Sequence, residues 1–184
     1  QDHLEIVTHL IKSGADIYAT NREGLDFIQA VGKQKKWELL KKLFQKDLNI
    51  EARGKDGLNH LQRAIKNNDV ILVEHLVKFG ADINIKDKNG NALLHLAIQA
   101  GHKDIAMLLI KAGANLAMQN ERGRLPLHVA AKLGHTEVAV ALVQADADLH
   151  ALDSRGLTPV ALASQAGQIN LLKQVFQSTD ADIN

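Results

Sequence analysis

Glycine recurs along this chain at a fixed interval of 33 residues. Several independent rows of residues keep the same interval and the same register, which makes coincidence implausible. A repeat of this length predicts an array of stacked units, because a unit this small cannot bury its apolar faces alone. The glycine rows are Gly24, Gly57, Gly90, Gly123 and Gly156, then Gly101, Gly134 and Gly167, then Gly14, Gly80 and Gly113.

Each period carries the same order of local signals. An Asp or Asn stands three residues before the first glycine, as Asp87 does before Gly90, which is typical of a tight turn. A short first helix is expected to follow, capped by residues such as Asn59 or opened by Pro126. It should end at the second glycine row, as at Gly134, where a left-handed residue is easily placed. A second helix with apolar residues at helical spacing and a short extended return complete the unit.

Composition limits the classes of protein and of site. Aromatic residues are only 3% of the chain, so its core must be built from Leu, Ile, Val and Ala. The absence of cysteine excludes a disulfide framework and thiolate metal sites, and fits a cytoplasmic, intracellular location, with the nucleus or delivery into a host cell left open. The longest apolar stretches, 105–110 and 138–143, are far shorter than a membrane span.

These motifs resemble the ankyrin repeat family. The segment Gly123-Arg-Leu-Pro-Leu-His-Val-Ala-Ala131, followed by Gly134-His135, is similar to the family's G-x-T-P-L-H-x-A-A and G-H signatures. The resemblance implies an all-α fold, an ankyrin-repeat solenoid of stacked helix-turn-helix units with short β-turn tips. The expected organisation is a single array over 1–184, with a partial repeat at 1–20 and repeats at 21–53, 54–86, 87–119, 120–152 and 153–184. Since neither end resembles a polar capping repeat, the chain is expected to be an excerpt of a longer protein.

The repeats that start at Asn21 and Gly54 depart from this pattern. They carry Phe27-Ile28-Gln29 and His60-Leu61-Gln62 in place of the Pro-Leu-His core. Arg63 occupies a position that is apolar in the other repeats, which predicts either looser local packing or a guanidinium that reaches outward to solvent. Near the end of the chain, Asp180-Ala181-Asp182 follows Asp146-Ala147-Asp148 by 34 residues instead of 33. The last repeat therefore has one extra residue, which lies between Lys173 and Thr179.

Neither metal binding nor catalysis is expected from these residues. His95 and His128, like His102 and His135, are one period apart, and the resemblance implies that these side chains hydrogen-bond backbone or a neighbouring repeat. Side chains one repeat apart do not converge on one ion, as zinc would require. No nucleophile motif or phosphate-binding glycine loop is present, so we expect no enzyme activity, no cofactor and no metal.

The resemblance implies a concave binding surface made by the turn tips and by the exposed side of the first helices. Basic residues strongly outnumber acidic residues in this set, although the whole chain is balanced at 22 basic and 21 acidic residues. A basic concave face and an acidic back are therefore predicted, with an acidic or phosphorylated segment of another protein as the partner. Lysine and arginine that are merely solvated at loop tips are the alternative. The predicted partner-binding residues are Arg22, Leu25, Lys33, Trp37, Arg53, Lys55, Lys66, Lys86, Lys88, Asn91, Arg122, Arg124, Lys132 and Arg155.

The segment 33–46 is basic and contains the only tryptophan, Trp37. It is interpreted either as a solvated helix face with a Trp that shields the irregular repeat, or as a contact hot spot. A nucleic-acid site would need more aromatic residues and a larger positive excess, so nucleic acid is not an expected partner. The pattern does not predict an oligomeric state.

The predicted function is a non-catalytic protein-interaction module of a scaffold, adaptor or effector. The alternative is a substrate-recruiting or autoinhibitory segment of a larger multidomain enzyme. A third interpretation, an architectural spacer, predicts no uneven charge, and the charge asymmetry argues against it.

Overall fold

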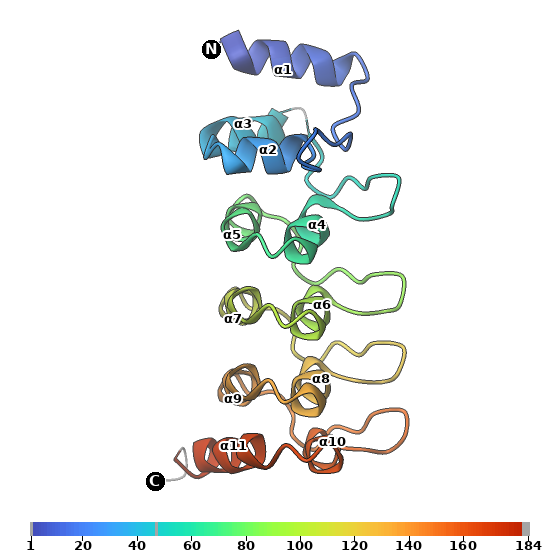
Figure 1. The fold of residues 1–184 in the computed structure, drawn as a ribbon, viewed down its shortest axis with the longest axis vertical. Helices are drawn as coiled ribbons and strands as arrows, with labels where there is room; N and C mark the ends of the chain where they lie inside the picture. Colours follow the sequence, from blue (N-terminus) through green and yellow to red (C-terminus); the bar gives the residue numbers. More distant parts are fainter. Residues whose placement is uncertain (1, 47, 182–184) are drawn as a thin grey trace. The chain divides into compact units, whose positions relative to one another are not determined.

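The computed structural model describes residues 2–46 and 48–181, and for residues 2–4 and 179–181 it describes the backbone only. The described residues form eleven α-helices and two isolated β-bridges, with no β-strand (Figure 1). The all-α repeat fold that the resemblance implies is therefore confirmed. The helices are α1 (Asp2–Lys12), α2 (Phe27–Lys33), α3 (Trp37–Lys46), α4 (His60–Lys66), α5 (Val70–Lys78), α6 (Leu93–Gln99), α7 (Lys103–Lys111), α8 (Pro126–Leu133), α9 (Thr136–Gln144), α10 (Pro159–Gln165) and α11 (Ile169–Ala181).

Contacts between Cα atoms divide the chain into two compact units. Unit 1 is 1–82 and contains α1 to α5, and unit 2 is 83–184 and contains α6 to α11. The boundary falls inside the repeat predicted at 54–86. The organisation of 1–184 as a single array with these repeat bounds stays a prediction. None of the helices in the described part of the chain is long and apolar enough to cross a membrane.

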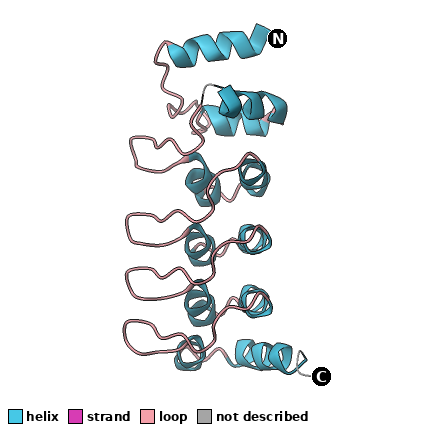
Figure 2. Ribbon diagram, turned by 180° about the vertical axis from the view of Figure 1, so that it is seen from behind, coloured by secondary structure: helices cyan, strands magenta, loops and turns pink. Residues whose placement is uncertain are grey.

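Unit 2 consists of three helix pairs stacked on one another (Figure 2). The first helices α6, α8 and α10 form one layer and the second helices α7, α9 and α11 form the other. Aliphatic side chains such as Leu94, Ile98, Ile105 and Leu109 fill the space between the layers and are at most 1% exposed. A core without aromatic rings allows the helices to pack closely, as the composition predicts.

Unit 1 contains the pairs α2–α3 and α4–α5, with α1 against α3 and α2 against α5. Its aliphatic core includes Ile28, Leu40, Leu43 and Leu72, all at most 1% exposed. In contrast to unit 2, aromatic side chains also lie between its helices. The ring of Tyr18 stacks on that of His60 with centroids 5.1 Å apart, a contact between residues far apart in the sequence.

The turns and helix ends form where their sequence signals predict. At the tip before α8, the side chain of Asn120 accepts hydrogen bonds from the backbone N–H groups of Arg122 and Arg124, and Gly123 is left-handed with φ of 66°. The two repeats that lack the Pro-Leu-His core, which start at Asn21 and Gly54, are called the eroded repeats. The first helix of each is capped by an Asx residue: Asp26 accepts the N–H of Gln29, and Asn59 accepts the N–H of Gln62, both at 2.9 Å.

The extra residue before Thr179 is absorbed in a helix. Helix α11 has 13 residues, whereas α7 and α9 have nine each. The helix runs through Asp180 to Ala181, although Asp146, the residue equivalent to Asp180 in the preceding repeat, lies after the end of α9 in a left-handed conformation with φ of 63°.

Candidate partner-binding groove

Unit 2 contains a polar groove of about 480 Å³ between the turn tips and first helices of two neighbouring repeats. Four predicted partner-binding residues, Asn91, Arg122, Arg124 and Lys132, contribute to it. The groove therefore lies among the turn tips and first helices, the surface on which the resemblance implies partner binding. Its lining residues are Asn89, Asn91, Gln99, Asn120, Glu121, Arg122, Arg124, Val129, Lys132 and Leu133.

Amide side chains form the floor of the polar groove. The Oδ1 atom of Asn91 accepts hydrogen bonds from the amide of Gln99 at 3.2 Å and from that of Asn120 at 3.1 Å. The Nδ2 atom of Asn91 donates to Asp87 at 3.2 Å, and the residue is only 7% exposed. Asn91 therefore supports the groove from below, where the sequence predicted a residue that touches the partner.

Arg124 is also a structural residue. Its side chain is 8% exposed and its Nε donates to Oδ2 of Asp153, which is 1% exposed, at 3.1 Å. Burial alone raises the pKa of Asp153, but hydrogen bonds from the backbone N–H groups of Leu157 and Arg155 and from Arg124 leave it below its ordinary value. The prediction that Arg124 offers its charge to a partner does not fit this geometry, because the charge is already paired with Asp153 inside the protein. The repeat register predicts where the backbone of Arg124 lies, but it does not reveal that the carboxylate of Asp153 lies beside it.

Arg122 and Lys132 form the cationic rim of the polar groove. Both are exposed, and neither forms an ion pair with a carboxylate of the described residues. Next to them Leu133 is 44% exposed and gives the rim an apolar side. The rim can thus offer positive charge and an apolar contact at the same place.

The other predicted partner-binding residues of unit 2 differ in whether their side chains already form a contact within the protein. Lys88 and Arg155 are exposed at the turn tips. Lys86 is exposed too, but its Nζ donates to the carbonyl oxygen of Gln119 at 2.8 Å, so it links two neighbouring repeats. Lys88 and Arg155 can therefore add to the positive potential of the tips without breaking a contact.

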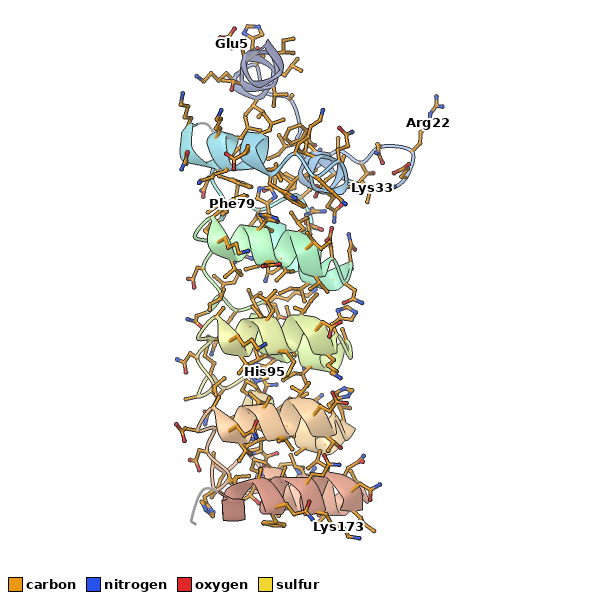
Figure 3. All side chains as sticks on the ribbon, turned by 90° about the vertical axis from the view of Figure 1, so that its left-hand side faces the viewer. Glu5, Arg22, Lys33, Phe79, His95 and Lys173 are labelled. Carbon is orange, nitrogen blue, oxygen red and sulfur yellow. The ribbon has the colours of Figure 1, made fainter. Side chains whose placement is uncertain are left out.

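In unit 1 most predicted basic residues already have partners, and Figure 3 labels two residues of this set, Arg22 and Lys33. Three of them are held within the unit: Lys33 pairs with Glu23 at 2.8 Å, Lys55 with Asp16 at 3.4 Å, and Arg53 donates to the carbonyl oxygen of Gly57 at 2.8 Å. Arg22 and Lys66 are exposed, and Leu25 is half-buried.

Trp37 is half-buried at the start of α3. Its ring stacks on the ring of His75 with centroids 3.9 Å apart and an interplanar angle of 12°. On Gly32 an added Cβ would lie 3.3 Å from the Trp37 ring, so glycine permits this close approach. These contacts support the interpretation that Trp37 shields the irregular repeat.

The guanidinium of Arg63 stays largely inside unit 1, so the prediction that it reaches out to solvent is wrong: the side chain is 17% exposed, and its buried Nε has no hydrogen-bond partner among the described residues. Its Nη2 donates to Asp56 at 2.6 Å, and its guanidinium lies over the ring of Tyr18 at 5.0 Å. Burial raises the pKa of Tyr18 to about 12, and burial together with the Arg63 charge lowers the pKa of His60 to about 4. Sequence reasoning missed this cluster, because its members come from three separate helices and loops and follow no motif.

The two histidines of the Pro-Leu-His positions act as predicted (Figure 3 labels His95). The Nε2 atom of His95 lies 2.8 Å from the carbonyl oxygen of Arg124, and that of His128 lies 3.1 Å from the carbonyl oxygen of Leu157. His102 does not fit the prediction, because its buried Nδ1 has no hydrogen-bond partner among the described residues. No group of three His, Asp or Glu residues in the described part of the chain could hold a metal ion.

Comparison with known families gives a match to "Ankyrin repeats (3 copies)" over residues 27–120 and again over 94–184. A comparison with curated proteins gives no match. The two family matches together cover residues 27–184, which include both helices of each eroded repeat and all of the helix pairs of unit 2. The chain belongs to the ankyrin repeat family.

Proposed function

We propose that the polar groove of unit 2 binds an acidic segment of another protein. Ankyrin repeats are generally protein–protein interaction modules and are generally non-catalytic. The observation that carries the proposal is the cationic rim, in which Arg122 and Lys132 flank one groove and pair with no carboxylate in the part of the chain that the structure describes. In this proposal the chain is a scaffold or adaptor module, at work in the cytoplasm.

The groove is suited to binding because its floor is already ordered. Asn91 has its amide groups satisfied within the protein, and Arg124 is held by Asp153. A partner therefore does not have to order these side chains, which lowers the entropic cost of association. The partner meets two cations, Arg122 and Lys132, against the single carboxylate of Glu121, with Leu133 exposed beside them. This combination fits a carboxylate or phosphate next to an apolar side chain.

The test is a double charge reversal, Arg122→Glu with Lys132→Glu, measured by fluorescence anisotropy. The probe is a labelled peptide of alternating Glu and Leu, compared with a phosphoserine counterpart and a Lys counterpart. We expect the reversal to weaken binding of both acidic peptides at least about tenfold, since an exposed ion pair contributes up to about 1 kcal/mol and each pair is replaced by repulsion.

The matched control reverses two lysines on second helices of the same unit, Lys111→Glu with Lys173→Glu. It makes the same change in net charge, and at about 0.15 M salt these residues act on the groove only weakly because exposed charges are screened within about 8 Å. Equal loss in both double variants, or acidic peptides that bind no better than the Lys peptide, would contradict the proposal.

A further inference from the structure

Unit 1 carries a second basic surface, on the side of the second helices. Five lysines are exposed on α3 and on the turn before it, and we name them the lysine patch: Lys35, Lys36, Lys41, Lys42 and Lys46. The apolar side of α3 is buried through Leu40 and Leu43, so the lysines are the face that α3 presents to solvent. The patch shares no residue with the polar groove of unit 2.

The lysines of the patch have no carboxylate partner among the described residues. Three other lysines show what pairing looks like in this protein: Lys33 binds Glu23, Lys78 binds Glu74 and Lys103 binds Glu137. Within 33–46 the only acidic residue is Glu38. The patch is therefore a local excess of positive charge in a chain whose overall charge is close to zero.

Lys35 occupies a backbone position that is costly for lysine. Its φ is 57°, whereas the equivalent turn residues are Gly101 and Gly134 in unit 2 and Asn68 in unit 1. Glycine and asparagine adopt this left-handed conformation readily and lysine does not. The turn is nonetheless well formed, since the N–H of Lys35 donates to the carbonyl oxygen of Gly32 at 2.8 Å. A strained residue that adds charge to a charged surface points to a function of that charge.

The chemistry of the patch separates its possible partners. Nucleic-acid surfaces use arginine forks and aromatic rings on which bases stack, but the patch has no arginine and Trp37 is stacked on His75 within the protein. Protein interfaces are depleted in lysine, which is flexible and strongly hydrated. An anionic lipid surface is fluid, so lysines can bind it without a fixed geometry and without losing their hydration. Clusters of lysine on an amphipathic helix are typical of proteins that bind such surfaces.

We propose that the lysine patch docks unit 1 on anionic lipid headgroups. The attachment is electrostatic and peripheral, because the apolar face of α3 is already used in the core. Attraction of this kind adds up over the lysines and acts over about 8 Å at 0.15 M salt. The proposal is independent of the polar groove, whose basic rim lies in the other unit.

The test is co-sedimentation of the full chain with phosphatidylcholine vesicles, with and without phosphatidylserine. We expect binding only with phosphatidylserine, and a loss of about 25-fold in the variant Lys41→Gln with Lys42→Gln, since each lysine near such a surface contributes about fivefold. The control, Lys111→Gln with Lys173→Gln, removes the same charge from exposed positions of unit 2 and should change binding less than about twofold.

Two further variants separate charge from structure. Lys41→Arg with Lys42→Arg keeps the charge and should keep vesicle binding, while Lys35→Asn keeps the left-handed turn and should lose about fivefold. The groove variant Arg122→Glu with Lys132→Glu should still bind vesicles, so failure of one proposal does not imply failure of the other. Equal loss in the patch and control variants overturns the proposal, as does binding to single-stranded RNA or to polyglutamate without binding to phosphatidylserine vesicles.

Discussion

The Nε atom of Arg124 lies 3.1 Å from Oδ2 of Asp153, and both side chains are almost completely buried between two turn tips of unit 2. Removal of one partner leaves a buried charge without compensation, which costs about 3–5 kcal/mol. We therefore expect Arg124→Met to lower the free energy of unfolding by about 3 kcal/mol in chemical denaturation. Arg122→Met is the matched control: Arg122 is exposed one position before Gly123, and the change should stay within about 0.5 kcal/mol. Similar losses in both variants would show that the buried pair is not the cause.

Unit 1 should lose stability in mild acid because of His60. Burial and the nearby Arg63 charge lower its pKa from 6.5 to about 4, so the folded protein holds the ring neutral while the unfolded chain takes up a proton below pH 6.5. The stabilisation is complete above pH 6.5 and is lost as the pH falls to about 4, to a total of roughly 3 kcal/mol. Thermal unfolding between pH 7 and pH 4 measures this loss. His60→Phe keeps an aromatic ring against Tyr18 and Phe44 but cannot titrate, and an unchanged pH dependence in this variant would contradict the assignment.

Lys35→Gly should stabilise the protein. Glycine relieves a left-handed strain of about 1 kcal/mol, offset in part by its greater freedom in the unfolded chain, so a net gain of about 0.5 kcal/mol is expected. The midpoint of thermal unfolding measures the gain. Asn68→Gly, at the equivalent turn with φ of 55°, should change stability less because asparagine tolerates this conformation. A decrease in stability in Lys35→Gly would mean that its side chain makes a stabilising contact.

His128 joins two repeats through its two ring nitrogens. Its Nδ1 accepts the N–H of Leu125 at 3.1 Å and its Nε2 lies 3.1 Å from the carbonyl oxygen of Leu157. Loss of both contacts in His128→Ala should cost about 3 kcal/mol, since each buried polar group left unpaired costs about 1–3 kcal/mol. His128→Gln should cost less, because Gln62 at the equivalent place accepts the N–H of Asn59 at 3.1 Å in the same way. Urea denaturation compares the two variants, and equal costs would show that the N-terminal contact contributes nothing.

The fold could be predicted from the sequence because its signals are local. Glycine and Asx residues mark the turns, and each helix needs only its own apolar spacing to be recognised. The site was predicted less completely. Arg124 and Asn91 lie at the predicted surface by backbone position, but the contacts that bury their side chains come from Asp153 and Asn120, in neighbouring repeats. A repeat register assigns positions and does not reveal such pairings.

The aromatic cluster of unit 1 escaped prediction for a related reason. Tyr18 and His60 are 42 residues apart, and neither belongs to a motif of the repeat. Their rings stack with centroids 5.1 Å apart, beside the aliphatic core of the eroded repeats. The absence of the Pro-Leu-His core indicated irregular packing there. The sequence does not show which side chains pack together in these repeats, because the contacts join residues that are far apart along the chain.

His95 and His128 each bind a carbonyl oxygen of the next repeat, at Arg124 and at Leu157. A carbonyl group is the same whichever amino acid carries it. This contact between repeats therefore does not depend on the exposed side chains at the tips, although buried tip residues such as Arg124 do join repeats through their side chains. An exposed tip residue such as Arg122 or Arg155 can be exchanged without loss of the His–carbonyl contacts. A module built in this way can change what it recognises while its framework stays as it is.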